Sequence, residues 1–530
     1  METSLGRLQK QVDTLSKQIV RLQDNLAIQK DEKRKAKYEL KKLKEQIDNR
    51  IEKALKKQEQ ELLKKFENEL KEKNQRIFEL ECRLNINSET SSLPSSKNPI
   101  NKEKKKIDIQ NSREKTNRKV GGQEGHKKST LQKFDDTEIT KIEEHTCSEC
   151  PYCHSKNLSI VQIKERDELD TKTILEKTRH TFITKKCNDC GRIIKSEIPK
   201  NLHGENQYGN ETKSIILMLY NYGFVSYNRI RDIMCGITNR EINPSESYMV
   251  KLQKKAGKAL ESFVFDVTEA LKQAKLLHWD DTVVGIGEKD KACFRAYSDR
   301  LFVLFRAHMA KNIEGMDEDG ILQNLSEDTI VVHDHLLHNY CSDYKYQNAE
   351  CNAHITRKLK GIVVNTKHNW ADDMEKFLKN TLKLRNEYIE KKITSFDETE
   401  LENILNTYDE IVERGFIEYN EFKHKHEYEN EENILEFLRD YKENITFWIR
   451  DFSVPYSNNF VESLLRMIKT KMKISLNFKS LEQARNFANI RSYTETCGNF
   501  GINKPLALKR LFEGNPYTVT ELIALKNSQN

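Results

Sequence analysis

The stretch LLHWDDTVV, residues 276–284, places two adjacent aspartates directly after an apolar run that is typical of a buried strand. Aspartate is depleted in strands, and near the core of a sheet its charge is costly unless it is paired, protonated or bound to a metal. The stretch therefore either ends a strand in a turn or forms the edge of an active site.

The sequence after this stretch predicts further strands. Strand-like runs follow at KACFRAYSD and RLFVLFRAHM, then a helix-like segment, NIEGMDEDGILQNL, and a fourth apolar run, DTIVVHDH. Three strands, a helix and a fourth strand, with acids at the strand ends, are the order of an RNase H-like α/β domain. Asp280 would lie on the first strand and Asp334 just after the fourth, so that neighbouring strands bring them together.

A third carboxylate is expected from a helix. The segment SNNFVESLLRMIKTKMK begins with Asn458 and Asn459, which are good N-cap residues, and then repeats apolar residues on one face. Glu462 lies in the first turn and Arg466 follows four residues later, on the same face. The segment also carries cations suited to a phosphate backbone: Lys469, Lys471 and Lys473.

Three converging carboxylates suit a site for two magnesium ions. Hard oxygen ligands hold two ions about 4 Å apart, one activating the attacking oxygen and one stabilising the leaving oxygen in phosphoryl transfer. We expect Asp280 to bridge the ions and Asp334 and Glu462 each to complete one, with Mn²⁺ as a substitute. The metal would offset the burial cost of the strand aspartate.

The residue pattern alone leaves alternatives open for each acid: Asp281 for Asp280, Asp343 for Asp334, and Glu482 or Glu495 for Glu462. Strand alternation says only that the two adjacent aspartates point to opposite faces. A chain with 83 acidic residues also supplies many accidental triads.

Five of the 11 cysteines are concentrated in one short part of the chain, which favours a metal site in a reducing compartment over disulfides. Two Cys-x-x-Cys pairs lie there: Cys150, Cys153, Cys187 and Cys190. Two such knuckles predict one structural, tetrahedral zinc ion in a zinc ribbon-like module. Cys147 or His154 could replace one of the four, and reduced cysteines without a metal are the alternative.

The N-terminal segment carries the a/d repeat of a coiled coil, at Leu5, Leu8, Val12, Leu15, Ile19, Leu22 and Leu26. The pattern continues less regularly to Leu84, with a slip near Arg50. We expect self-association to at least a dimer; a single solvated helix or a return hairpin is the alternative.

A basic linker is expected next, containing a KEKKK run and the turn-forming GGQEGH, Gly121 to His126. The following helical sequence contains a glycine turn at Gly236 and a second helix opened by Asn243-Pro244-Ser245. It resembles a helix-turn-helix, with an ordinary helical hairpin as an equal alternative. The candidate DNA contacts there are Lys251, Lys254 and Lys255.

The long gap between Asp334 and Glu462 is mostly charged helical sequence, which predicts a helical insertion. Trp370 and Trp448 are expected in its core, and stacking on a displaced base is the alternative.

The composition, with 36% hydrophobic and 33% charged residues and a net charge of +7 over 530 residues, suits several domains with long exposed helices. The longest apolar run, SIILMLYNYGF, is too short for a bilayer, and the N-terminus lacks an apolar signal core, so we expect a soluble cytoplasmic protein.

The ordered motifs resemble the insertion sequence 66 family of DDE transposases. They are GGQEGH, CPYC with CNDC, LLHWDDT, VVHDH, CNAH followed by RKL, NNFVESLLR and YTETCGNFGINKP. The resemblance implies Asp280, Asp334 and Glu462 as the catalytic triad and the two cysteine pairs as zinc knuckles. Cys351 and His354 resemble a Cys-x-x-His signature of such transposases, with a buried packing pair as the alternative.

This chain departs from the family pattern at three places. This chain has Asp281 where the family has glutamate, His335-Leu336 where the family has glycine-tyrosine, and Ser457 where the family has aspartate. These positions leave open whether the chain is fully active, because neighbouring groups orient metal ligands.

We therefore expect a multidomain α+β protein. The predicted parts are a coiled coil (1–86), a basic linker (87–130), a zinc module (131–205), a helix-turn-helix-like domain (206–268), an RNase H-like core (269–364 and 451–530) and a helical insertion (365–450). The resemblance implies a transposase that binds terminal inverted repeats, cleaves DNA and transfers the 3′-hydroxyl strand, with DNA, a second copy and accessory transposition proteins as partners. The alternative is an inactive transposase that acts as a zinc-containing DNA-binding scaffold.

Overall fold

The computed structural model describes residues 2–85, 134–421 and 429–529, apart from residues 161, 163, 165, 170–173, 191, 200, 201 and 203. The predicted linker with Gly121–His126 lies outside these residues. The chain divides into two compact units. Unit 1 comprises Met1–Asn98, Arg357–Lys376 and Thr407–Asp440, and unit 2 comprises Pro99–Thr356, Phe377–Asn406 and Tyr441–Asn530. Among the described helices, none has the length and apolar character needed to cross a membrane.

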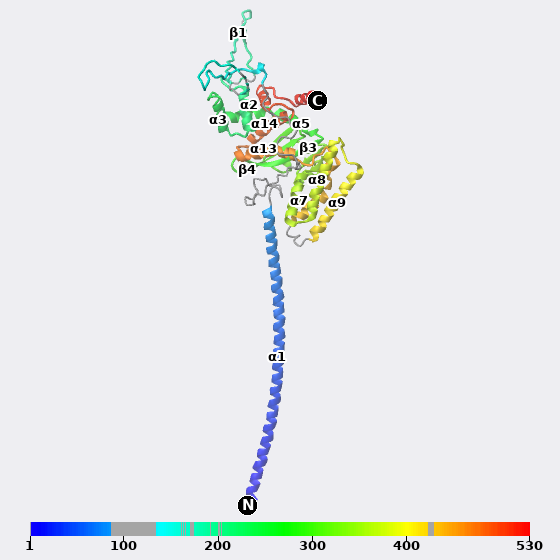
Figure 1. Ribbon diagram of the computed structural model, residues 1–530. Helices are drawn as coiled ribbons and strands as arrows, with labels where there is room; N and C mark the ends of the chain where they lie inside the picture. Colours follow the sequence, from blue (N-terminus) through cyan, green and yellow to red (C-terminus); the bar gives the residue numbers. More distant parts are fainter. Residues whose placement is uncertain are drawn as a thin grey trace. The chain divides into compact units, whose positions relative to one another are not determined.

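The N-terminal part of unit 1 is one long helix, α1, Glu2–Asn85 (Figure 1). The helix continues without interruption through Arg50, where the repeat slips. Its seam residues remain largely in solvent, with Leu8 58% and Leu15 57% exposed. The prediction of a long N-terminal helix is confirmed, and its apolar seam is unburied along the described length of this chain.

The remainder of unit 1 is helical and includes α10, Glu429–Asp440. Trp370 is fully buried there, and its indole N–H donates to Glu431 Oε1 at 2.6 Å. A Cβ at Gly415 would lie 2.5 Å from Leu435 and 2.9 Å from the Trp370 ring, so a glycine permits this close packing. Trp370 is therefore a core residue, as the sequence favoured.

Unit 2 contains a six-stranded mixed sheet in the order β5-β4-β3-β6-β7, with β8 paired to β3. Strands β3 to β5 are antiparallel neighbours, whereas β6 runs parallel to β3 and β7 parallel to β6. This arrangement is consistent with an RNase H-like domain. The strands are β3 Leu276–Ile286, β4 Asp290–Ser298, β5 Val303–His308, β6 Ile330–His333, β7 Gln347–Glu350 and β8 Asn477–Phe478.

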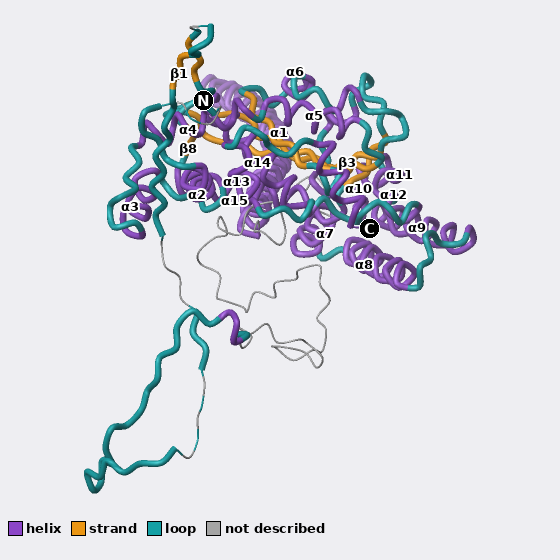
Figure 2. Tube along the Cα trace, turned by 90° about the horizontal axis from the view of Figure 1, so that it is seen from above, coloured by secondary structure: helices purple, strands orange, loops and turns teal. Residues whose placement is uncertain are grey.

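Helices bury both faces of this sheet (Figure 2). On one face, Phe294 and Phe305 pack in a core with Leu465 of α13, Asn459–Ser475. On the other face, Tyr297 and Leu304 share a core with Phe263 of α5, Glu261–Lys272. Successive strand residues thus enter different cores, which follows from the two-residue period of a strand. The even-numbered face of β3, which includes Asp280, is the face that α13 covers.

The predicted helical domain contains α2, Asn210–Asn221, α3, Tyr227–Ile237, and α4, Glu246–Ala259. The expected turn at Gly236 is wrong, because α3 runs through that residue and the chain turns at Asn239 and Arg240, both at positive φ. The predicted start of the second helix is confirmed, since Ser245 caps α4 by accepting a hydrogen bond from the Tyr248 amide.

The remaining helices and the small β1-β2 sheet lie outside the six-stranded sheet. They are β1 Thr184–Lys186, β2 Ile193–Lys195, α6 Ile313–Asp317, α7 Asn352–Thr366, α8 Asn369–Glu390, α9 Glu398–Glu421, α11 Lys442–Ile445, α12 Phe447–Arg450, α14 Leu481–Asn499, α15 Lys504–Phe512 and α16 Val519–Gln529.

Candidate active site

The two adjacent aspartates of β3 have different surroundings. Asp281 is held on the odd-numbered face, where Oδ1 lies 2.8 Å from Lys311 Nζ and Oδ2 accepts from Cys293 Sγ at 3.6 Å. Asp280 points to the opposite face, and one of its oxygens accepts the Asp281 amide N–H at 2.7 Å. Because Asp281 already has a cationic partner, Asp280 is the better candidate for a metal ligand.

Asp280 lies where negative charge is concentrated. Burial raises the pKa of its carboxyl to about 7, and the neighbouring Asp334 and Glu462 carboxylates contribute to the rise. Acids placed this close resist ionising together, and a divalent cation would reverse that effect. Asp334 and Glu462 have donor atoms within 4.8 Å of each other, in a group with Cys351 and His354, and Asp280 lies near enough for their charges to affect its pKa. The three acids are therefore candidates to hold a divalent metal.

Asp334 follows directly after β6. Strand β6 pairs in parallel with β3 from Leu276↔Ile330 to His278↔Val332, so Asp280 and Asp334 each lie two residues beyond the last pair. The Asp334 Oδ1 atom is 2.6 Å from Nδ1 of His354, yet this buried oxygen receives no hydrogen bond of good geometry. An oxygen in that situation is suited to accept a metal ion.

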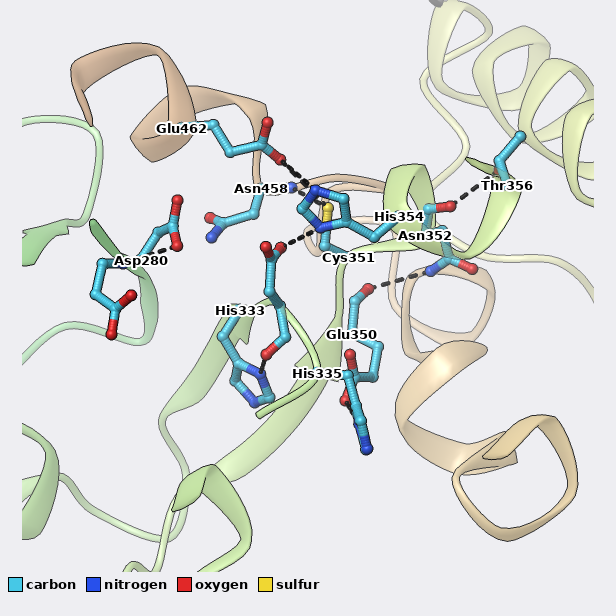
Figure 3. Close-up of polar contacts among 12 residues, drawn as sticks. Asp280, His333, His335, Glu350, Cys351, Asn352, His354, Thr356, Asn458 and Glu462 are labelled. Atoms are coloured by element: carbon cyan, nitrogen blue, oxygen red, sulfur yellow. Dashed lines mark hydrogen bonds and ion pairs between the residues drawn. The ribbon is translucent and has the colours of Figure 1, made fainter. Parts of the chain in front are cut away.

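Glu462 lies in the first turn of α13 and completes the cluster (Figure 3). Its Oε1 atom lies 3.7 Å from Cys351 Sγ and 4.0 Å from His354 Nε2, while Oε2 lies 3.3 Å from the Arg466 guanidinium. Glu462 is 9% exposed, whereas the Arg466 side chain is 62% exposed. The helix therefore presents one buried carboxylate and one solvent-facing cation at the same site.

Asn458 connects this helix to the central strand. Its side chain was expected to cap α13, but it makes no cap hydrogen bond. Instead, Asn458 Nδ2 donates to the Trp279 carbonyl at 2.8 Å and Oδ1 lies 3.1 Å from His278 Nδ1, while the Asn458 amide donates to Cys351 Sγ at 3.2 Å. Asn459 is exposed at the helix start. Asn458 therefore holds the start of the Glu462 helix against the Asp280 strand.

Strand β7 and its Glu350 were missed in the sequence, because QNAE has no apolar alternation. Glu350 is buried and Oε1 accepts the Tyr340 hydroxyl at 2.5 Å and lies 2.7 Å from His335 Nδ1. His335, one of the departures from the family pattern, therefore pairs with Glu350.

The competing acids have other positions. Glu482 pairs with Lys254 at 2.7 Å, Glu495 pairs with Lys504 at 2.6 Å, and Asp343 lies in an exposed turn. The geometry thus favours Asp280, Asp334 and Glu462 over these alternatives.

The expected DNA-contacting cations are exposed, with one exception. Lys469 and Lys473 are exposed on α13, as are Lys251, Lys254 and Lys255 on α4. Lys471 is buried instead, with Nζ 4.3 Å from the Tyr220 ring centroid and 5.2 Å from that of Phe487. The expectation that Lys471 faces a phosphate is wrong, because its position along α13 points it into the aromatic core.

Each cysteine pair forms a local turn. The pKa of the Cys150 thiol is lowered by the amides of Tyr152 and Cys153, and that of Cys187 by the amides of Cys190 and Asp189. Cys187 and Cys190 lie in the connection between β1 and β2. Backbone amides that point at a cysteine sulfur in this way suit a metal-binding thiolate. The structure does not bring the two pairs together. Among the described residues, one group of three or more potential metal ligands has donor atoms within 4.8 Å of one another, and that group lies at Asp334 and contains none of these four cysteines.

Comparison with known families gives one match. Residues 205–486, more than half of the chain, match the model described as Transposase IS66 family. No curated protein matches the chain. The matched segment contains the three acids of the cluster as well as Cys351 and His354. With this match and the resemblance of the motifs, the chain belongs to the IS66 family of transposases.

Proposed function

We propose that this chain is an active DDE-type transposase that cleaves DNA at the ends of its element and joins the freed 3′-hydroxyl to target DNA. The supporting observation is the convergence of carboxylates from β3, from the end of β6 and from the first turn of α13. Burial raises the pKa of Asp280, and the charges of Asp334 and Glu462 raise it further. Family membership implies phosphoryl transfer, and this cluster is the arrangement that such chemistry needs.

Asp280, Asp334 and Glu462 would hold the divalent ions. Those ions, when bound, activate the attacking oxygen and stabilise the leaving oxygen. The protein supplies orientation, because Asn458 fixes the start of α13 to β3, while Asp281 on the opposite face of β3 is paired with Lys311. The exposed guanidinium of Arg466, 3.3 Å from Glu462, is placed to contact a DNA phosphate.

The other parts of the chain would bind and assemble. The exposed lysines of α4 suit a phosphate backbone within a helix-turn-helix, and the unburied seam of α1 suits a parallel or antiparallel coiled coil between two copies. The two cysteine knuckles, whose sulfur atoms the structure does not bring together, would have to approach each other to bind one structural zinc ion. Accessory transposition proteins remain expected partners.

The competing function is a DNA-binding scaffold without cleavage. Labelled DNA carrying the element's ends, incubated with the native chain in Mg²⁺ or Ca²⁺, separates the two. We expect Mg²⁺-dependent nicking, its loss in Glu462→Gln with DNA binding retained, and little change in the control Glu482→Gln, whose acid lies in an ion pair with Lys254. Tight binding with no nicking by the native chain in Mg²⁺ or Mn²⁺ would establish the scaffold instead.

A further inference from the structure

The acid cluster contains two donors that magnesium chemistry does not require. Cys351 offers sulfur and His354 offers nitrogen beside the carboxylates of Asp334 and Glu462, and the four donor atoms lie within 4.8 Å of one another. Magnesium takes oxygen ligands, whereas imidazole and thiolate favour zinc, cobalt and related ions. This donor set is softer than three carboxylates alone.

The distances are close to those around one four-coordinate ion. Zinc bonds of about 2.0–2.3 Å place neighbouring ligand atoms about 3.3–3.8 Å apart in a tetrahedron. Cys351 Sγ lies 3.7 Å from Glu462 Oε1, and His354 Nε2 lies 4.0 Å from the same oxygen (Figure 3). Small side-chain shifts would therefore allow sulfur, nitrogen and oxygen to bind one ion.

The cluster also supplies the outer contacts that such ligands need. Metal-binding histidines almost always direct their second ring nitrogen at a carboxylate or carbonyl. His354 Nδ1 lies 2.6 Å from Asp334 Oδ1, which is an ion-pair distance, although the angle is poor for a hydrogen bond. The Asn458 amide donates to Cys351 Sγ at 3.2 Å and so fixes the position of the sulfur. If Cys351 and His354 served only to pack the core, their polar atoms would not need to lie beside two carboxylates.

We propose that Cys351, His354 and Glu462, with Asp334 orienting the imidazole, form a site for a borderline-soft divalent ion such as zinc or cobalt. An ion there withdraws Glu462 and Asp334 from magnesium, so the site inhibits DNA cleavage when it is occupied. This regulatory consequence rests on the proposed function, whereas the binding of the ion does not.

The test is a Co²⁺ titration of the full chain, followed by the near-ultraviolet absorbance of cobalt–thiolate bonds. The zinc knuckles contribute to this signal in every variant, so the difference between variants is the readout. We expect the native chain and the control Cys293→Ser to bind one more Co²⁺ than Cys351→Ser, and His354→Gln to bind that ion at least about 10-fold more weakly. A large excess of Mg²⁺ should leave the signal intact. Equal stoichiometry and affinity in all four proteins, or displacement by Mg²⁺, would overturn the proposal.

A second measurement needs no variant, since Cys351 is buried and its replacement could disturb folding. Iron(II) with ascorbate and peroxide cuts a polypeptide close to where the iron is bound. We expect cuts near residues 351–354 and near Glu462 that Zn²⁺ suppresses and Mg²⁺ does not; their absence contradicts the proposal. Magnesium-dependent DNA nicking without such cuts would reject this site alone, whereas zinc-sensitive cuts in a chain that never nicks DNA would reject only the transposase activity.

Discussion

Replacement of Asn458 by alanine should loosen the contact between the Glu462 helix and the Asp280 strand. The side chain is fully buried and bonds the Trp279 carbonyl at 2.8 Å and His278 Nδ1 at 3.1 Å. Each buried group left without a partner costs about 1–3 kcal/mol, so the two together should cost about 2–4 kcal/mol after partial relaxation. Burial lowers the pKa of His278 to about 4, so its ring is neutral at pH 7 and the lost contact is a neutral hydrogen bond.

Hydrogen–deuterium exchange resolved by peptide measures this loss where it occurs. If local opening controls exchange, amides in β3 and the first turns of α13 should exchange about 30- to 1000-fold faster in Asn458→Ala than in native chain. The matched control is Asn459→Ala, which changes the exposed neighbour. Equal exchange in the two variants would show that the Asn458 side chain does not join the helix to the strand.

Three further predictions concern titration, packing and assembly. The pKa of Asp280 is raised to about 7, so between about pH 4 and 7 this carboxyl is protonated in the metal-free native state and ionised in the unfolded state. The melting temperature of the metal-free chain should therefore rise from pH 8 to pH 5.5, relative to that of Asp280→Asn. Equal pH dependence of the two melting temperatures would contradict this. Lys471→Met, which keeps the volume among the aromatic rings, should change stability by less than about 1.5 kcal/mol, whereas Lys471→Ala should lose about 2–4 kcal/mol; equal urea midpoints for both would count against the packing role. Removal of residues 1–85 should lower the number of copies per particle measured by sedimentation. The same number of copies with and without these residues would show that α1 does not assemble the protein.

The sequence predicted the strand that carries Asp280 because apolar alternation and β-branched residues reflect burial on a sheet directly. The N-terminal helix was predicted from its seven-residue repeat of apolar residues, which places them along one side of a helix. The choice between Asp280 and Asp281 could not be made from the strand period, since it needed the ion pair with Lys311, which comes from a segment beyond β5.

The features that were missed depend on contacts between distant segments. Asn458 is a residue type typical of an N-cap. Its hydrogen bond to the β3 strand becomes visible only when the position of that strand is known. Lys471 looks like one of several surface cations, but the aromatic residues that enclose it come from α2, β8 and α14. Strand β7 is short and polar, so its pairing with β6, and not its own propensity, defines it.

We assign Asp280, and not its neighbour Asp281, to the proposed metal-binding cluster. Magnesium-dependent nicking of DNA carrying the element's ends, compared between Asp280→Asn and Asp281→Asn at equal DNA binding, tests it most directly. We expect Asp280→Asn to abolish nicking and Asp281→Asn to retain measurable activity. Nicking that survives in Asp280→Asn and disappears in Asp281→Asn would contradict it.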